Sequence, residues 1–281
     1  MTRASQRGVA VVLAMGVVSL AAIAAAAMLV SQSLWSRHAE LAAQHAQAQA
    51  LVQAGVDWAR ALLGDDRRMS SADHLGEPWA LRLPPVPVDN GELAGHIDDQ
   101  QGAFNLNNLV RSGAPSPAHL AQFRRLLGIL ALPEALAAGL AEWLDAAKRP
   151  LADVAELAAV RGFDAAARAR LGPFVAALPR ATALNVNTAP PEVLAAVVQG
   201  LDLDQARALG AQRERAHFRS LSEFLLQLPP GAAADHADLT TASQYFLASV
   251  RVSIGEAQAR GTALLARDAG GWPAVVWRKY P

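Results

Sequence analysis

Few residues in this 281-residue sequence have the types and spacing that chemistry at an active site requires. Cysteine is absent, which excludes disulfides, thiolate nucleophiles and cysteine-based zinc sites. The motifs G-x-S-x-G and H-E-x-x-H and a glycine-rich phosphate loop are also absent. We therefore predict no catalytic residue and expect that the protein is not an enzyme.

Histidines and paired aspartates are the remaining candidates for metal ligands. Among the 7 histidines, His38 and His45 stand at positions i and i+7 and would share one helix face, but no third ligand lies near them. A solvated helix face is the simpler interpretation. The pairs Asp65-Asp66 and Asp98-Asp99 are interpreted as turn residues rather than ligands. The sequence predicts no metal site and no cofactor.

Charge and composition narrow the class of protein further. Lys plus Arg and Asp plus Glu number 25 each, so no large field of one sign exists to hold a polyanion. Nucleic acid is therefore disfavoured as a partner. Hydrophobic residues make up 52% of the chain, which is enough for the core of one large domain or two modest ones.

An apolar segment near the N-terminus is the strongest single feature. Residues 9–30 carry no charged side chain, and a helix of this length, at about 1.5 Å per residue, crosses a hydrocarbon core of roughly 30 Å. Arg3 and Arg7 precede it, which predicts a cytoplasmic N-terminus with the rest of the chain outside. A cleaved secretory signal is the alternative, but its apolar region usually has only about 7–15 residues. We favour a single-span membrane anchor.

Helical periodicity continues beyond the apolar segment. Apolar residues recur near the 3.6-residue period up to Leu63, with polar residues off that stripe. Gly64-Asp65-Asp66 then predicts the end of the helix. The sequence thus predicts one helix of about 55 residues and roughly 80 Å, apolar in its first half and amphipathic in its second.

The rest of the chain predicts strands on either side of a helical block. Residues 65–91 are predicted to be loop with a short edge strand, followed at Asn90-Gly91 by a turn signal and at residues 92–98 by a strand. Period-2 alternation predicts three more strands, with Gly270-Gly271 turning the last pair, at residues 246–254, 263–268 and 274–280.

Between these strands, residues 115–240 are predicted to be helical with short breaks. A weak repeat matches residues 133–136 with 191–194, and later residues 151–157 with 221–226. Each half is expected to be a small bundle stacked on its twin. The predicted fold class is α+β: a long N-terminal transmembrane helix packed on a small antiparallel sheet, with a large all-α insertion of two helical sub-bundles.

The N-terminus resembles the class III leader of type IV pilins and of the pseudopilins of type II secretion. The leader MTRASQRG ends at Arg7-Gly8, and the apolar helix begins at Val9. The resemblance implies that prepilin peptidase cuts after Gly8 and that the new N-terminus at Val9 is methylated. In most of that superfamily the fifth mature residue is glutamate, whereas this chain has the apolar Leu13.

Leu13 makes the chain similar to the large minor pseudopilin of type II secretion, the K subunit (GspK family, general secretion pathway protein K). Residues 102–109, 150–163 and 183–194 are also similar to stretches of that family in matching order. The resemblance implies a tip subunit of the periplasmic pseudopilus, needed for export of folded proteins across the outer membrane. It implies partners in the I and J minor pseudopilins, the major pseudopilin and prepilin peptidase, and a site in the bacterial inner membrane with the soluble domain in the periplasm.

The expected organisation combines the residue patterns with this resemblance. It consists of a prepilin leader (1–8), a transmembrane helix (9–31), the periplasmic half of that helix (32–64), a loop and first strands (65–103), an all-helical insertion similar to SAM or helix-hairpin-helix modules (104–240) and closing strands (241–281).

Two ligands of similar proteins are expected to be absent. Related K subunits carry an acidic stretch after a W-[IL]-D motif, which the resemblance links to calcium. Here Trp143-Leu144-Asp145 runs directly into Ala-Ala-Lys-Arg-Pro, so six or more oxygen ligands are hard to assemble. Residues 183–194 are also similar to the helix-hairpin-helix opening of membrane-anchored DNA-uptake proteins, which is the alternative function. Asp202 and Asp204 in the following hairpin would repel phosphate, so we expect the helical module without its DNA ligand.

Overall fold

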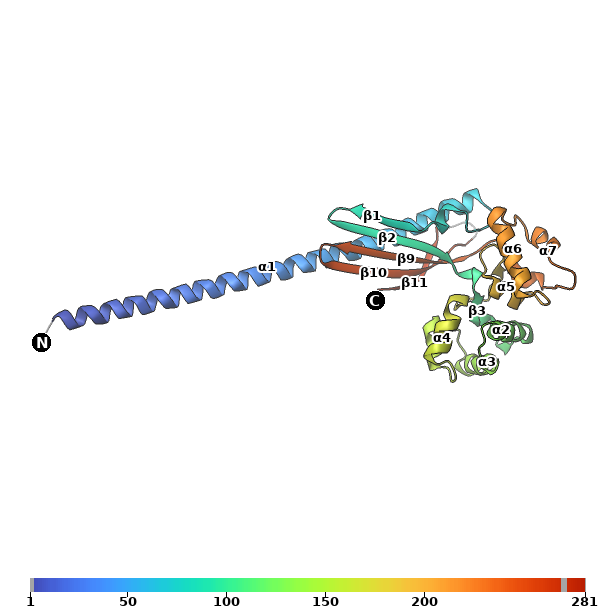
Figure 1. Cartoon of the computed structure of the whole chain (residues 1–281), viewed down its shortest axis with the longest axis horizontal. Coiled ribbons are helices and arrows are strands. Elements are labelled where there is room, and N and C mark those ends of the chain that lie inside the picture. The colour runs from blue at the N-terminus through green and yellow to red at the C-terminus, as the bar shows by residue number, and fades with distance from the viewer. Residues whose placement is uncertain (1–2, 269–271, 281) are drawn as a thin grey trace.

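A single helix, α1 (Arg3–Met69), sets the outline of the molecule in the computed structural model, which describes residues 3–268 and 272–280. It has 67 residues, about 100 Å at 1.5 Å per residue, and its first half projects free of the rest of the chain (Figure 1). This half is long and apolar enough to cross a membrane, and none of its most apolar window is buried. The span and the packed half therefore belong to one continuous element.

The predicted end of this helix at Gly64-Asp65-Asp66 is wrong, because α1 continues to Met69. An ideal Cβ at Gly64 would lie 3.5 Å from Cδ of Pro273, so this glycine lies against the segment that precedes the last strand. The same turn of helix holds Asp66, whose ion pair is described below. Arg67 and Arg68 lie in the last turn, where cations interact favourably with the helix dipole. Tertiary contacts therefore outweigh the local stop signal.

The sheet is antiparallel throughout, with strand order β1-β2-β9-β10-β11. Its strands are β1 (Leu83–Val88), β2 (Gly91–Asp99), β9 (Tyr245–Ile254), β10 (Ala257–Ala266) and β11 (Ala274–Lys279). The strand predicted at residues 263–268 is longer and begins at Ala257, because a tight turn at Gly255 joins it directly to β9. The turn predicted at Gly270-Gly271 lies outside the described residues.

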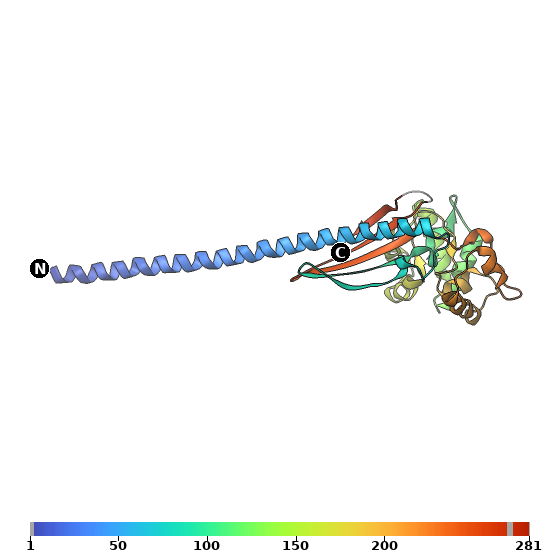
Figure 2. The same cartoon turned by 90° about the horizontal axis from the view of Figure 1, so that it is seen from above.

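The second half of α1 packs on one face of this sheet (Figure 2). Val52, Val56 and Leu63 of the helix are buried against Phe246 and Leu265 of the strands. Full burial of a side chain of this size is worth about 1.5–3 kcal/mol, so the interface is a substantial core. Gly261 permits the close approach, since an ideal Cβ there would lie 2.4 Å from Val52 Cγ1. The helix is therefore fixed to the domain along this whole face.

The insertion between β2 and β9 consists of short helices with a second, larger core. Its α-helices are α2 (Pro117–Ile129), α3 (Ala135–Ala147), α4 (Ala165–Leu171), α5 (Pro191–Val197), α6 (Leu203–Arg215) and α7 (Leu221–Leu226). Short 3₁₀ turns are η2 (Gln100–Gly102), η3 (Leu106–Leu109), η4 (Val154–Ala159), η5 (Gly172–Phe174) and η6 (His236–Asp238), while η1 (Pro78–Ala80) precedes the sheet. The predicted all-α insertion also holds two-residue strands, which sequence periodicity cannot reveal at that length.

These short strands close each half of the insertion. In the first half β3 (Phe104–Asn105) pairs in parallel with β6 (Val175–Ala176), and in the second half β7 (Leu184–Asn185) pairs in parallel with β8 (Leu239–Thr240). A third pair, β4 (Val110–Arg111) with β5 (Ala114–Pro115), forms a small hairpin. Helices α2 and α5 pack together within one core, so the two halves are stacked as the repeat predicts.

Candidate functional site: a buried polar junction

The residues predicted to direct processing lie on the projecting half of α1. Gly8 and Val9 belong to its helical backbone, and Leu13 is exposed along with its apolar neighbours. His38 and His45 are also exposed on α1. No other part of the described chain approaches Leu13, so this region is available to lipid or to other helices. A different set of residues forms the polar centre of the folded part.

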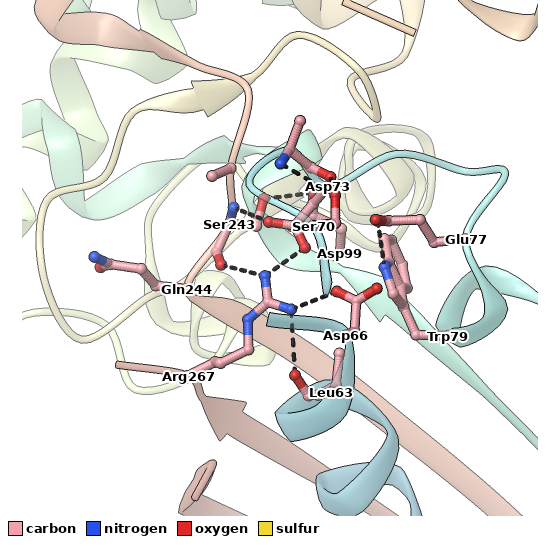
Figure 3. A network of polar contacts seen from close by, with 12 residues as sticks. Leu63, Asp66, Ser70, Asp73, Glu77, Trp79, Asp99, Ser243, Gln244 and Arg267 are labelled. Atoms are coloured by element: carbon pink, nitrogen blue, oxygen red, sulfur yellow. Dashed lines mark hydrogen bonds and ion pairs between the residues drawn. The ribbon is translucent and has the colours of Figure 1, made fainter. Parts of the chain in front are cut away.

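Arg267 is the centre of a buried junction where α1, the sheet and the insertion meet (Figure 3). Its side chain is 1% exposed, and Nη1 lies 2.8 Å from Oδ2 of Asp66 in the last turns of α1. Its Nη2 pairs with Asp73 and donates to the carbonyl of Ser243 at 3.0 Å. The guanidinium also stacks over the ring of Phe246, 4.6 Å from the centroid. One arginine thus joins the end of α1 to the loop that holds Asp73 and to the segment that precedes β9.

Carboxylates outnumber cations at this junction. Asp66, Asp73 and Glu77 are buried, with oxygens within 4.8 Å of one another. Glu77 accepts from the indole of Trp79 at 2.8 Å, and Asp73 accepts from the backbone N–H of Ser243 at 2.6 Å. Burial and then the charge of Glu77 raise the pKa of Asp66 to about 6. The Arg267 guanidinium supplies the positive charge among these three groups, so we interpret them as a structural ion-pair network rather than a metal site.

Asp99 extends the junction into the insertion. Its Oδ2 accepts hydrogen bonds from Asn185 at 2.9 Å, Thr188 at 2.6 Å and Ser243 at 2.7 Å. Its Oδ1 accepts from the backbone N–H of Gln101 at 2.8 Å. Burial raises the pKa of this carboxyl above its ordinary value despite these bonds. The end of β2 is thereby tied to the second half of the insertion.

The predicted role as turn residues is wrong for Asp65 and Asp66, which lie within α1. Asp98 and Asp99 are the last two residues of β2, and Asp99 does shape a turn, because its side chain caps η2 at the N–H of Gln101. Only Asp66 and Asp99 are members of the junction. Arg267 is the residue that sequence reasoning missed. The alternation of side chains along a strand could have indicated that Arg267 is buried, because it lies two residues after Leu265 and four after Ala263, which both face inward.

Within each half of the insertion, one asparagine side chain binds the backbone of a residue distant in sequence. Asn107 accepts from the N–H of Leu151 at 2.8 Å and donates to its carbonyl at 2.9 Å. Asn187 accepts from the N–H of Phe218 at 2.9 Å and donates to its carbonyl at 2.9 Å. In each half the asparagine two positions earlier caps the backbone of the clasping one. These asparagine clasps show that the repeat extends to residues 105–107 and 185–187, where side-chain-to-backbone bonding shapes each turn.

Ser116, His119 and Asp238 form a chain that the sequence did not predict. Ser116 Oγ lies 2.8 Å from His119 Nδ1, and His119 Nε2 lies 3.2 Å from Asp238 Oδ1. The proximity of His119 and the hydrogen bond from Gln122 hold the pKa of Asp238 below its ordinary value. Ser116 is the N-cap residue of α2, and His119 is buried in the packing between α2 and η6. We interpret the chain as a polar tie between the two halves.

In the hairpin between α5 and α6, which would contact DNA in the alternative function, the two aspartates bind groups of α6 itself. Asp202 caps α6 by accepting from the N–H of Gln205 at 2.8 Å, and Asp204 pairs with Arg207 at 2.9 Å. Gly200, with φ of 79°, makes the turn between α5 and α6. Two helices joined by a glycine turn are therefore present, and the turn and the first turn of α6 carry two carboxylates. Asp145, at the motif linked to calcium, pairs with Lys148 at 2.7 Å.

Comparisons with known proteins give the same family description for the insertion and for nearly the whole chain. Two family models, both described as type II secretion system (T2SS), protein K, match residues 102–180 and 184–248. Type II secretion system protein K of Pseudomonas aeruginosa is 33% identical over 98% of this chain and 93% of that protein. Its counterpart in Klebsiella pneumoniae is 30% identical over 98% of this chain and 96% of that protein.

A solved structure shares the fold. The crystal structure of the GspK-GspI-GspJ complex from the type 2 secretion system of enterotoxigenic Escherichia coli contains a chain that matches with a TM-score of 0.75. The match covers 87% of this chain and 99% of that chain at 24% identity. The predicted α+β class, with its long helix, antiparallel sheet and helical insertion, is confirmed.

Proposed function

The chain belongs to the type II secretion system protein K family of minor pseudopilins, and we propose that it occupies the tip of the periplasmic pseudopilus and serves the export of folded proteins. The observation that carries this proposal is α1, which joins an uncovered apolar half to a half buried in the domain. A subunit that must be held in a membrane and then join a bundle of similar helices requires such an element. The large insertion at the far end from the membrane would leave no room for another subunit.

The membrane half of α1 supplies the means of assembly. Arg3 and Arg7 support a cytoplasmic N-terminus, which puts the folded part in the periplasm. Small residues on the exposed span permit close approach of a neighbouring helix, as they do generally in lipid, and they are Ala14, Gly16, Ala21, Ala22 and Ala25. Leu13 leaves this subunit without the glutamate that would pair with the terminal amine of a subunit above it, which suits a tip position.

Partners follow from the same premise. The solved relative was crystallised as a complex of GspK with GspI and GspJ. We propose that the corresponding I and J minor pseudopilins and the major pseudopilin bind this chain, and that prepilin peptidase cuts between Gly8 and Val9. The function is assembly rather than catalysis, since His119 and Asp238 of the Ser116-His119-Asp238 chain are buried in the packing between the two halves of the insertion.

Two measurements test the proposal. Mass spectrometry of the chain isolated from membranes is expected to show an N-terminus at Val9 carrying a methyl group, whereas an intact Met1 or a cut after residue 30 contradicts it. Affinity capture of the tagged full-length chain is expected to recover the I and J minor pseudopilins. Replacement of Gly8 by a bulkier residue should block processing and serves as the matched control. Recovery of neither partner by the processed chain contradicts the assembly role.

A further inference from the structure

The face of the sheet that is turned away from α1 carries two arginines that pair with no carboxylate of the described residues. Arg251 of β9 and Arg260 of β10 lie directly opposite each other across the two strands. Both are exposed, and within residues 3–268 and 272–280 neither forms an ion pair or a side-chain hydrogen bond. Helix α1 covers only the opposite face, where Val250 and Val252 point. The two guanidinium groups therefore face solvent side by side.

The register of the sheet gives this arginine pair one short neighbour in its own row and longer polar neighbours in the two flanking rows. Ala94 of β2 lies opposite Arg251 on its other side. One flanking row of the same face holds His96, Ser249, Thr262 and Lys279, and the other holds Glu92, Ser253 and Gln258. Lys279 pairs with Asp153 of the insertion. Both arginines of the pair are exposed, so an approaching protein surface can reach their guanidinium groups.

Nearby acidic residues of the described chain form no ion pair with the two arginines. Asp98 lies 3.1 Å from the His96 ring and 3.8 Å from Arg82. Glu92 lies opposite Ser253, one row away, and pairs with neither arginine among the described residues. Like charges directly opposite each other destabilise a sheet. The arginine pair is thus unfavourable in the isolated subunit and would be relieved by carboxylates from outside it.

The height of the pair above the membrane argues against lipid as the source of that negative charge. The turn between β9 and β10 contacts Gln44 of α1, where the N–H of Glu256 donates to Gln44 Oε1 at 3.2 Å. Gln44 follows the end of the apolar segment at Val30 by about 20 Å of helix at 1.5 Å per residue. This exceeds a Debye length of about 8 Å at physiological salt, so lipid head groups are screened from the pair.

We propose that Arg251 and Arg260 form a docking site for a carboxylate-bearing surface of a neighbouring pseudopilin subunit, an inference that rests on the proposed function. Guanidinium groups bind carboxylates in a bidentate fashion, and Cβ atoms directly opposite across strands lie about 5 Å apart. The pair fits two acidic side chains presented on one helix face or one strand. The contact selects a partner by charge and orients it on the open face of the sheet.

Charge reversal tests the docking site in the full-length chain. A tagged chain is coexpressed with the I, J and major pseudopilins and captured from detergent-solubilised membranes. The R251E/R260E variant is expected to recover at least one of these subunits about tenfold less than the wild type, whereas R251K/R260K, which keeps both charges, loses less. The control R161E/R219E makes the same change in net charge at two exposed arginines of the insertion and should capture as the wild type does.

A stability measurement separates docking from folding. Because the two like charges repel, R251A/R260A is expected to unfold at the same temperature as the wild type or higher while capturing less partner. Unchanged capture by R251E/R260E overturns the docking site, as does a lowered unfolding temperature of R251A/R260A. Binding of the wild type to phosphatidylglycerol vesicles that R251E/R260E abolishes would assign the pair to lipid and also overturn it. A wild-type chain that captures no pseudopilin contradicts the proposed function itself, a result distinct from these.

Discussion

Arg267 Nη1 lies 2.8 Å from Asp66 Oδ2, and this contact joins the residue that follows β10 to the last turns of α1, 201 positions earlier in the chain. Both side chains are buried, with 1% and 7% exposed. The end of the long helix is thereby held by charge as well as by apolar packing.

Asp66 should make stability depend on pH. Its pKa is raised from 3.8 to about 6 in the folded state, so the folded state binds the proton more tightly than the unfolded state does. The contribution of Asp66 to stability is therefore full below about pH 4 and is lost as pH rises through about 6. We expect a loss of about 1–3 kcal/mol across this range that D66N lacks. Urea unfolding of both proteins at pH 4.5 and pH 7.5 measures it, and parallel pH profiles would contradict the prediction.

Removal of Arg267 should destabilise the protein strongly. R267M leaves Asp66, Asp73 and Glu77 buried without their cation, and breaking a buried ion pair from one side costs about 3–5 kcal/mol. The control R278M removes a partly exposed arginine of β11 and should cost less than about 1 kcal/mol. Chemical unfolding measures the loss in the free energy of unfolding of each variant relative to the wild type. Equal losses would show that the junction does not depend on this guanidinium.

The asparagine clasps should be equivalent in the two halves of the insertion. N107A and N187A each leave the N–H and the carbonyl of one buried residue without partners, which costs about 1–3 kcal/mol for each unsatisfied group. N90A, in the exposed turn between β1 and β2, is the matched control and should change stability by less than about 0.5 kcal/mol. Thermal unfolding detects the difference. A neutral effect of either clasp variant would refute the equivalence.

Calcium should not bind at Asp145. Lys148 already lies 2.7 Å from this carboxylate, and a calcium ion needs six or more oxygen ligands. Titration calorimetry of the purified chain with CaCl₂ is expected to show no saturable heat at micromolar concentrations. A tight site that D145A removes would contradict this expectation.

Sequence periodicity predicted the long helix, the outer strands and the helical insertion, because each is long enough to repeat its pattern several times. It failed at Gly64, where a local stop signal gives way to contacts with Pro273 and Arg267 from the other end of the chain. It also missed the two-residue strands β3, β6, β7 and β8, which have no period of their own.

The polar residues were harder to assign than the elements that carry them. Asp66 and Asp99 had turn-forming neighbours, and their partners lie far away in sequence, so nothing local indicated that they would be buried. His119 is similarly paired with Asp238 across the two halves of the insertion. Gly8 and Val9 at the proposed processing site and Leu13 at the fifth mature position are different, because their proposed roles depend on the N-terminal segment and not on any contact in the folded part.

The continuity of α1 has a mechanical consequence. No proline interrupts residues 3–69, and the first proline of the chain is Pro78. A helix without a kink has no internal hinge, so a tilt or displacement of its apolar half also moves the sheet and the Arg267 contact at its other end. Forces on the two ends of α1 are therefore transmitted along one continuous helix.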